Sequence, residues 1–106
     1  MLKCVIFDLD QTLVDTKALE LHRKNRAWSL VYQMIPSTKL FPGIQELINK
    51  IESFGLKKCI VTTSPRSYAE KVVQHYGWTF DFLVCYHDVV NKKPHPESMF
   101  KVIEHF

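Results

Sequence analysis

The sequence lacks the features that mark membrane-spanning and secreted proteins. None of its apolar runs approaches the length that crosses a bilayer, and it has no internal repeats or low-complexity tracts. A predicted strand starts so near the first residue that no room is left for a signal peptide. We therefore expect a cytoplasmic protein with no membrane partner.

Cysteine is scarce and shows no pairing pattern. Cys4, Cys59 and Cys85 are odd in number, contain no C-x-x-C spacing, and each falls inside a predicted strand. We expect all three to be reduced thiols that pack as small buried side chains. The histidines match no metal-ligand spacing either.

Charge of one sign is not in large excess. The net charge of +3 suits a protein that handles anionic small molecules, but it is too small for the electrostatic footprint of a nucleic-acid-binding protein. With 46% hydrophobic and 24% charged residues, the composition is that of an ordinary globular protein. A chain of 106 residues forms one small domain at most.

The first apolar segment ends on two acidic residues. Val5-Ile6-Phe7, preceded by Leu2-Lys3-Cys4, predicts a strand buried on both faces, as in a parallel sheet. Asp8 and Asp10 follow at its carboxyl end, where ligands bind in open α/β sheets. Two carboxylates this close repel each other unless a proton or a divalent cation intervenes, and oxygen ligands suit Mg²⁺. The alternative is that both aspartates cap the next turn in solvent.

The rest of the chain alternates between predicted helices and strands. A polar segment from Thr16, its candidate N-cap, to Ile35 predicts an imperfect amphipathic helix. Ser64 before Pro65 predicts the start of a later helix, whose free N–H groups would form an anion site beside Thr62. The other elements predicted from apolar spacing are helices over residues 44–54, 65–76 and 97–106 and strands over 57–61 and 82–86.

A basic cluster lies on the first of these helices, at residues 22–26. Two interpretations fit it. It is either a solvated helix face or a surface that attracts a phosphorylated substrate toward Asp8 and Asp10.

Each predicted strand is followed by a different polar group: Asp8 and Asp10, then Thr62, then Lys93 in a Pro-rich loop. A nucleophilic carboxylate, a hydroxyl donor and a fixed cation together suit phosphoryl transfer. At this point the sequence resembles the haloacid dehalogenase (HAD) superfamily of phosphohydrolases over nearly its whole length. The resemblance is carried, in order, by Phe-Asp-Leu-Asp-x-Thr-Leu-Val-Asp, Phe-Pro-Gly before a helix, Ile-Val-Thr-Thr-Ser and Lys-Lys-Pro-x-Pro-Glu.

The resemblance implies a role for each of these side chains. Asp8 would attack phosphorus and become an aspartyl-phosphate, while Asp10 would protonate the leaving oxygen and later deprotonate the attacking water. Thr62 would donate a hydrogen bond to a phosphoryl oxygen, and Lys93 would offset charge on Asp8 and the phosphoryl group. Mg²⁺ would bridge the Asp8 carboxylate, the Asp10 backbone carbonyl and the substrate. Further candidates for substrate contact are Thr12, Thr63, Ser64 and Arg66.

The resemblance also implies a Rossmann-like α/β fold, with a HAD-like core of parallel strands in the order 3-2-1. A small helical cap insertion would lie between about Asp15 and Leu40, short enough to leave the site open. The family's fourth and fifth strands, and the acidic fourth motif that supplies another metal ligand, are missing from residues 1–106. We therefore predict a single, incomplete domain whose first strand pairs with a further segment or a partner chain. Gln11 stands where the family usually has Gly, which predicts a turn that tolerates a side chain.

The motifs and the roles that the resemblance implies for them together indicate a Mg²⁺-dependent phosphatase acting on a phosphorylated small molecule or macromolecule. Asp10 argues against a dehalogenase, which is expected to lack an acid at this position, and a phosphomutase of the superfamily stays open. The alternative from another class is an inactive binding or interaction module, because the fourth motif is missing. A receiver-like signalling domain also uses Asp, Thr and Lys, but its phosphorylated Asp follows the third strand.

Overall fold

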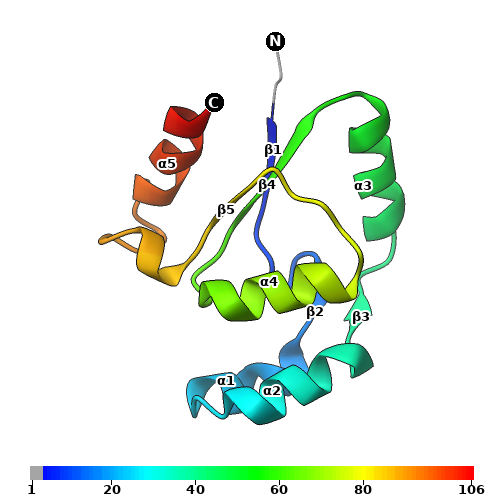
Figure 1. The fold of residues 1–106 in the computed structure, drawn as a ribbon, viewed down its shortest axis with the longest axis vertical. Coiled ribbons are helices and arrows are strands. Elements are labelled where there is room, and N and C mark those ends of the chain that lie inside the picture. Colours follow the sequence, from blue (N-terminus) through cyan, green and yellow to red (C-terminus); the bar gives the residue numbers. More distant parts are fainter. Residues whose placement is uncertain (1–3) are drawn as a thin grey trace.

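The computed structural model describes residues 4–106 (Figure 1), so Leu2 and Lys3 of the first predicted strand lie outside the described residues. No helix in this range is both long and apolar enough to cross a bilayer. The strands are β1 (Cys4–Phe7), β2 (Val14–Asp15), β3 (Lys39–Leu40), β4 (Lys57–Val61) and β5 (Phe82–Val84). The α-helices are α1 (Glu20–Lys24), α2 (Trp28–Met34), α3 (Ile44–Ser53), α4 (Arg66–His75) and α5 (Glu97–His105), with 3-10 helices at Lys17–Leu19, Ile35–Ser37 and Tyr86–Asp88.

The main sheet is parallel and has the order β1-β4-β5, which agrees with the predicted linear order of the first three core strands. Ile6 of β1 lies opposite Cys59 of β4, and Val61 lies opposite Val84 of β5. All three strands therefore end at the same edge, which brings the polar residues after β1 and β4 together.

Successive residues of the strands pack into two separate cores, because side chains alternate between the faces of a sheet. On one face, Phe7 and Ile60 pack with residues of α3 and α4 such as Ile48 and Tyr68. On the other face the buried cluster comprises Cys59, Val61, Val84, Val89 and Val102, the last from α5. Figure 1 shows α5 and α3 on opposite sides of the strands, so the sheet lies between two helical layers.

The two faces are not covered equally. α5 buries Val102 but leaves Phe100 and Ile103 53% and 66% exposed, so much of its predicted apolar stripe faces outward. Leu47 of α3 has the spacing of that helix's buried apolar face, with Ile44, Ile48 and Ile51, but it is 43% exposed. These side chains are exposed because each helix contacts the sheet through fewer of its apolar residues than the apolar spacing in the sequence suggested.

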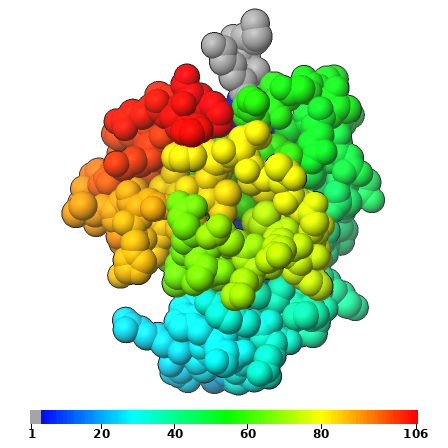
Figure 2. All heavy atoms as spheres, in the orientation of Figure 1, coloured from blue at the N-terminus to red at the C-terminus, as the bar shows by residue number. Residues whose placement is uncertain are grey.

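The segment predicted as one amphipathic helix from Thr16 to Ile35 is instead broken into short pieces. It leaves the core through β2 and returns through β3, with Val14 opposite Leu40. Arg26 has φ 56°, a left-handed conformation that ends the first piece before Trp28 starts α2. Residues 16–38, between β2 and β3, are called the inserted segment below, and the role of this segment as a cap stays a prediction. Figure 2 shows this segment as a separate cyan layer beneath the core.

The three cysteines are free thiols, and Cys59 and Cys85 are buried. Cys85 does not lie inside a strand, because β5 ends at Val84 rather than at Tyr86 as predicted. The 3-10 helix that follows begins at Tyr86, and the Asp88 carboxylate accepts the Cys85 N–H at 2.7 Å, which takes the backbone away from the sheet.

β1 forms the edge of the sheet as far as residues 4–106 extend. Beside it is a hollow of about 630 Å³ whose walls include Ile6, Asp8, Pro94 and Met99. An apolar edge with unpaired backbone groups is a template for another strand. We therefore propose that a further segment of a longer protein, or a second chain, pairs with β1.

This proposal makes a prediction about the isolated 106-residue chain. We expect it to associate as its concentration rises and to melt over a broad range, because the β1 edge stays open. Size-exclusion chromatography with light scattering, combined with a thermal melt, measures both properties. A monodisperse monomer with a sharp, cooperative melt would show that β1 needs no partner.

Candidate active site

Asp8 lies where β1 leaves the sheet, and Lys93 reaches it from the loop before α5. The Lys93 ammonium is 3.2 Å from Asp8 Oδ1 and donates a 2.9 Å hydrogen bond to the Val61 carbonyl at the end of β4. Asp8 Oδ1 also accepts the Leu9 N–H at 2.8 Å. The Asp8 and Lys93 side chains are 47% and 33% exposed. The structure thus holds a solvent-accessible carboxylate beside a cation that is tied to a neighbouring strand end.

Thr62 and Ser64 occupy the loop between β4 and α4, and both are buried. The Thr62 N–H donates to the Val84 carbonyl at 2.9 Å, and its hydroxyl accepts the Ser64 N–H at 3.1 Å. The prediction that Ser64 is the N-cap of α4 is wrong. Pro65 adopts an extended conformation with ψ 152°, so the helix begins one residue later, at Arg66. The Ser64 hydroxyl is then free to donate to Asp10.

The Asp10 carboxylate is held by four donors from three parts of the chain. Oδ1 accepts hydrogen bonds from the hydroxyls of Thr16 and Tyr68, both at 2.7 Å, and forms an ion pair with Arg23 at 2.8 Å. Oδ2 accepts the Ser64 hydroxyl at 2.8 Å. The Asp10 side chain is only 14% exposed. Thr16 stands at the predicted N-cap position, before the 3-10 helix Lys17–Leu19, but its hydroxyl makes no capping hydrogen bond because it binds this carboxylate instead.

The turn between β1 and β2 fixes where Asp10 points. Gln11 has φ 60°, a conformation that favours Gly, and its side-chain Oε1 accepts the Thr16 N–H at 2.9 Å. The side chain that replaces the family's usual Gly thus makes a hydrogen bond that Gly cannot make. This bond fixes the backbone of Thr16 close to Asp10.

Tyr68 is fully buried beneath Asp10, with the Arg23 guanidinium 5.4 Å from the centre of its ring. Burial raises the pKa of Tyr68 well above its ordinary value, and the charge of Asp10 raises it further. The hydroxyl therefore stays a neutral donor to Asp10 throughout the neutral range of pH.

We expect Tyr68→Phe to lower the free energy of unfolding by about 1–2 kcal/mol at pH 7, because a hydrogen bond to a charged acceptor is lost. Above about pH 10 the unfolded tyrosine ionises while the folded one does not, so wild-type stability falls and the difference between the two proteins shrinks. Cys59, whose pKa burial raises to about 12, adds the same alkaline trend to both proteins. Urea unfolding of the full-length protein from pH 7 to 11 measures the difference; a constant difference would contradict this assignment.

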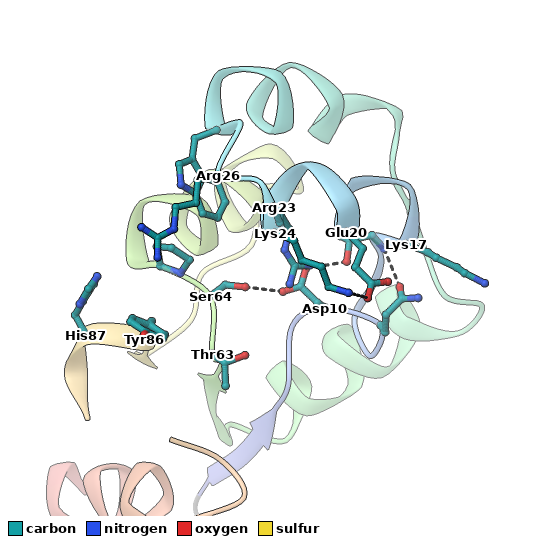
Figure 3. A pocket seen from close by; sticks show the side chains of 14 residues that line it. Asp10, Lys17, Glu20, Arg23, Lys24, Arg26, Thr63, Ser64, Tyr86 and His87 are labelled. Carbon is teal, nitrogen blue, oxygen red and sulfur yellow. Dashed lines mark hydrogen bonds and ion pairs between the residues drawn. The ribbon is translucent and has the colours of Figure 1, made fainter. Parts of the chain in front are cut away.

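A cavity of about 590 Å³ opens between the inserted segment and the core. Its walls include Asp10, Arg23, Thr63, Ser64 and Tyr86. Figure 3 shows Asp10, Arg23 and Ser64 close together, with Tyr86 and His87 at the opposite end. In Figure 2 the surface is hollowed between the cyan segment and the orange segment after β5.

The other predicted substrate contacts fall in different places. Thr63 is exposed in the wall of this cavity, whereas Thr12 is exposed on the turn after β1. Arg66 is bound to the Asp88 carboxylate and donates a 2.9 Å hydrogen bond to the Leu83 carbonyl, so its guanidinium ties α4 to β5.

The structure brings predicted catalytic and substrate-binding residues together in two groups, and Thr62 is not among the lining residues of either hollow. Asp8 and Lys93 form one pair, and both line the hollow beside β1. Asp10 and Ser64 form the other pair, and both line the cavity beside the inserted segment. The Asp10 carboxylate is thus turned toward the inserted segment, although Asp10 follows Asp8 by only two positions in the sequence.

Three residues that hold Asp10 were not predicted to do so. Thr16 was expected only to cap a helix. Tyr68 falls in the helix predicted over residues 65–76, and the sequence contains no signal for the partner of its hydroxyl. Arg23 was part of the basic cluster at residues 22–26, whose charge was a signal for contact with an anionic group, but nothing in the sequence separates Arg23 from Lys24 and Arg26.

Known proteins resemble this chain in sequence over part of its length. The family model described as "Haloacid dehalogenase-like hydrolase" matches residues 20–106, which begins after Asp8 and Asp10. The N-acetylmuramic acid 6-phosphate phosphatase of Pseudomonas putida is 38% identical over 64 residues, which is 58% of this chain and 29% of that protein. The pyrophosphatase PpaX of Halalkalibacterium halodurans is 35% identical over 65 residues, 59% of this chain and 30% of that protein.

The solved structure of CbbY from Rhodobacter sphaeroides in complex with phosphate superposes with a TM-score of 0.84 at 17% identity, covering 98% of this chain and 72% of that one. This match confirms the predicted Rossmann-like α/β fold. The matched region spans less than a third of the length of the phosphatase from Pseudomonas putida and of PpaX. Those relatives are named as phosphatases.

Proposed function

The chain belongs to the haloacid dehalogenase-like hydrolases, and we propose that it carries the nucleophile and most of the catalytic groups of a Mg²⁺-dependent phosphatase. The observation that supports this most directly is the pair of Asp8 and Lys93, 3.2 Å apart at the carboxyl end of β1. Phosphatase names among the relatives point to the same reaction class.

Asp8 is the proposed nucleophile. Leu9 N–H and the Lys93 ammonium both bind Oδ1, so we assign the attack to Oδ2. A bond forms between this oxygen and phosphorus while the bond from phosphorus to the leaving oxygen breaks, which gives an aspartyl-phosphate. Water then attacks phosphorus, releases inorganic phosphate and regenerates the Asp8 carboxylate.

Asp10, Thr62 and Lys93 have supporting roles in this proposal. Asp10 gives a proton to the leaving oxygen in the first step and takes one from the attacking water in the second. The Thr62 hydroxyl, which accepts the Ser64 N–H, keeps its own hydrogen to donate to a phosphoryl oxygen. The Lys93 ammonium lies beside Asp8 Oδ1, where its hydrogen bond to the Val61 carbonyl holds it, and offsets negative charge on Asp8 and the phosphoryl group.

The donor set of this strand end fits a magnesium ion. The Asp8 carboxylate is a half-exposed hard oxygen ligand, and the backbone hydrogen bonds of the following turn go to the carbonyls of Leu9 and Val14 rather than to that of Asp10. Within residues 4–106 no three acidic, imidazole or thiol groups converge on one point. Mg²⁺ keeps several waters in such sites. When bound, it would supply positive charge that neutralises the phosphoryl oxygens.

The test is phosphate release from an aryl phosphate by the full-length protein, with Mg²⁺ and with a chelator. We expect turnover with Mg²⁺, and its loss with the chelator. Restoring Mg²⁺ to the chelated sample serves as the control for irreversible damage. A folded full-length protein that releases no phosphate from several aryl and alkyl phosphates would favour an inactive binding module.

A further inference from the structure

In this structure, Asp10 is held in a way that does not suit the proton donor of the proposed reaction. A guanidinium can only donate hydrogen bonds, and the Arg23 guanidinium lies 2.8 Å from Asp10 Oδ1. The hydroxyls of Thr16, Tyr68 and Ser64 also donate to this carboxylate. Asp10 is therefore occupied as an acceptor and is turned toward the insertion, away from the hollow that Asp8 and Lys93 line.

Arg23 is the charged member of this set, and it comes from α1 of the inserted segment. Its side chain is 23% exposed and lies in the wall of the 590 Å³ cavity, where a ligand can reach it. The three hydroxyl donors carry no charge, and a hydroxyl hydrogen can rotate to another acceptor when the carboxylate turns. Release of Asp10 therefore depends mainly on what happens to the Arg23 guanidinium.

The cavity around Arg23 favours anions. Its lining contains basic side chains at Lys17, Arg23, Lys24 and Arg26, and its carboxylates are Asp10 and Glu20. Both carboxylates are already matched with cations, since Asp10 is paired with Arg23 and Glu20 lies 3.5 Å from Lys24. An oxyanion that enters the cavity therefore meets an excess of positive charge, and its volume is that of a pocket for an organic ligand.

We propose, on the basis of the phosphatase function argued above, that Arg23 is a specificity-determining residue for phosphate esters that carry a second anionic group. The second group, a carboxylate or a phosphate, takes the Arg23 guanidinium from Asp10. Asp10 then takes a proton from solvent and turns toward the leaving oxygen next to Asp8, to which it gives that proton. Recognition of the substrate and release of the acid thus occur in one ion-pair exchange.

The energetic reason for selectivity is that Arg23 never loses its partner during this exchange. Leaving a partly buried charge unpaired is costly, whereas replacing one oxyanion with another is nearly neutral. A substrate without a second anionic group must leave Arg23 unpaired or leave Asp10 bound. We expect a difference of about tenfold between the two substrate types, which is the effect of one charge-assisted hydrogen bond.

The first test measures binding and does not depend on turnover. Phosphonoacetate, which has a phosphonate and a carboxylate, and propylphosphonate, which has no carboxylate, are titrated into the full-length protein by calorimetry. We expect wild type to bind phosphonoacetate about tenfold more tightly, and Arg23→Gln to bind both ligands within about twofold of each other. Lys57→Gln is the matched control, because it removes one positive charge from the opposite end of β4, where Lys57 is paired with Asp81. It should keep the tenfold preference.

Equal binding of the two phosphonates by wild type, no binding of either, or a preference that survives Arg23→Gln would each overturn the proposal. Loss of the preference in Lys57→Gln would also overturn it, because the selectivity would then come from net charge rather than from Arg23.

The second test separates this proposal from the proposed function. In hydrolysis of phenyl phosphate and 4-carboxyphenyl phosphate, Arg23→Gln should raise kcat for the first and lower the ratio of kcat/KM between the second and the first. A purely structural role of Arg23 would lower both rates together. If wild type hydrolyses both esters and Arg23→Gln leaves the ratio unchanged, the inference fails and the phosphatase function stands. If wild type hydrolyses neither, the phosphatase function fails.

Discussion

Asp8→Asn should reduce phosphate release by the full-length protein at least about a thousandfold, because an amide does not act as the nucleophile in phosphoryl transfer. Asn keeps an Oδ1 acceptor for the Leu9 N–H that Asp8 now binds at 2.8 Å. The Asp8 side chain is 47% exposed, so we expect the free energy of unfolding to change by less than about 1 kcal/mol. Activity and stability are therefore expected to separate in this variant. Initial rates with an aryl phosphate and a urea unfolding curve measure the two quantities.

Asp15→Asn is the matched control for this experiment. Asp15 is an exposed carboxylate at the end of β2, and it accepts the Lys17 N–H at 3.3 Å. The same chemical change at this position should leave the rate within about twofold of wild type. If Asp8→Asn kept more than a tenth of the wild-type rate while remaining folded, Asp8 would not be the nucleophile.

Lys93→Met should lower kcat/KM about a hundredfold or more, because removing one preorganised donor at a site of developing charge typically has an effect of this size. Methionine fills a similar volume but provides neither the charge beside Asp8 nor the hydrogen bond to the Val61 carbonyl. The pair is partly exposed, so the cost in stability should stay within about 1 kcal/mol. Steady-state kinetics together with a thermal melt measure the outcome.

The adjacent lysine provides a close control. Lys92 donates to the Val89 carbonyl and places its ammonium 4.4 Å from the centre of the Tyr86 ring, so it is turned away from Asp8. Lys92→Met removes the same charge one residue earlier and should change kcat/KM less than about threefold. Equal losses in Lys92→Met and Lys93→Met would indicate a general loss of positive charge rather than a contact with Asp8.

Local patterns predicted the elements of the core well and those of the insertion poorly. β4, α3 and α5 were predicted close to their observed bounds, because apolar spacing and a following Gly such as Gly55, with φ 71°, are local signals. Leu21 illustrates the opposite case. It lies in the segment predicted as one amphipathic helix and is 64% exposed, because the left-handed conformation of Arg26 breaks the helix before an apolar face can form.

The sequence by itself determined the parallel sheet and the placement of polar residues after its strands. An apolar strand favours a parallel sheet, and parallel strands end at one edge. The predicted burial of the first strand on both faces is not reached within residues 4–106, where only Phe7 of β1 is buried. Only the tertiary structure decided which way each polar side chain points. Lys93 turns to Asp8 while Lys92 does not, and Asp10 turns to Arg23. The reason is that these orientations depend on hydrogen bonds between residues distant in the chain, and spacing along the sequence carries no information about them.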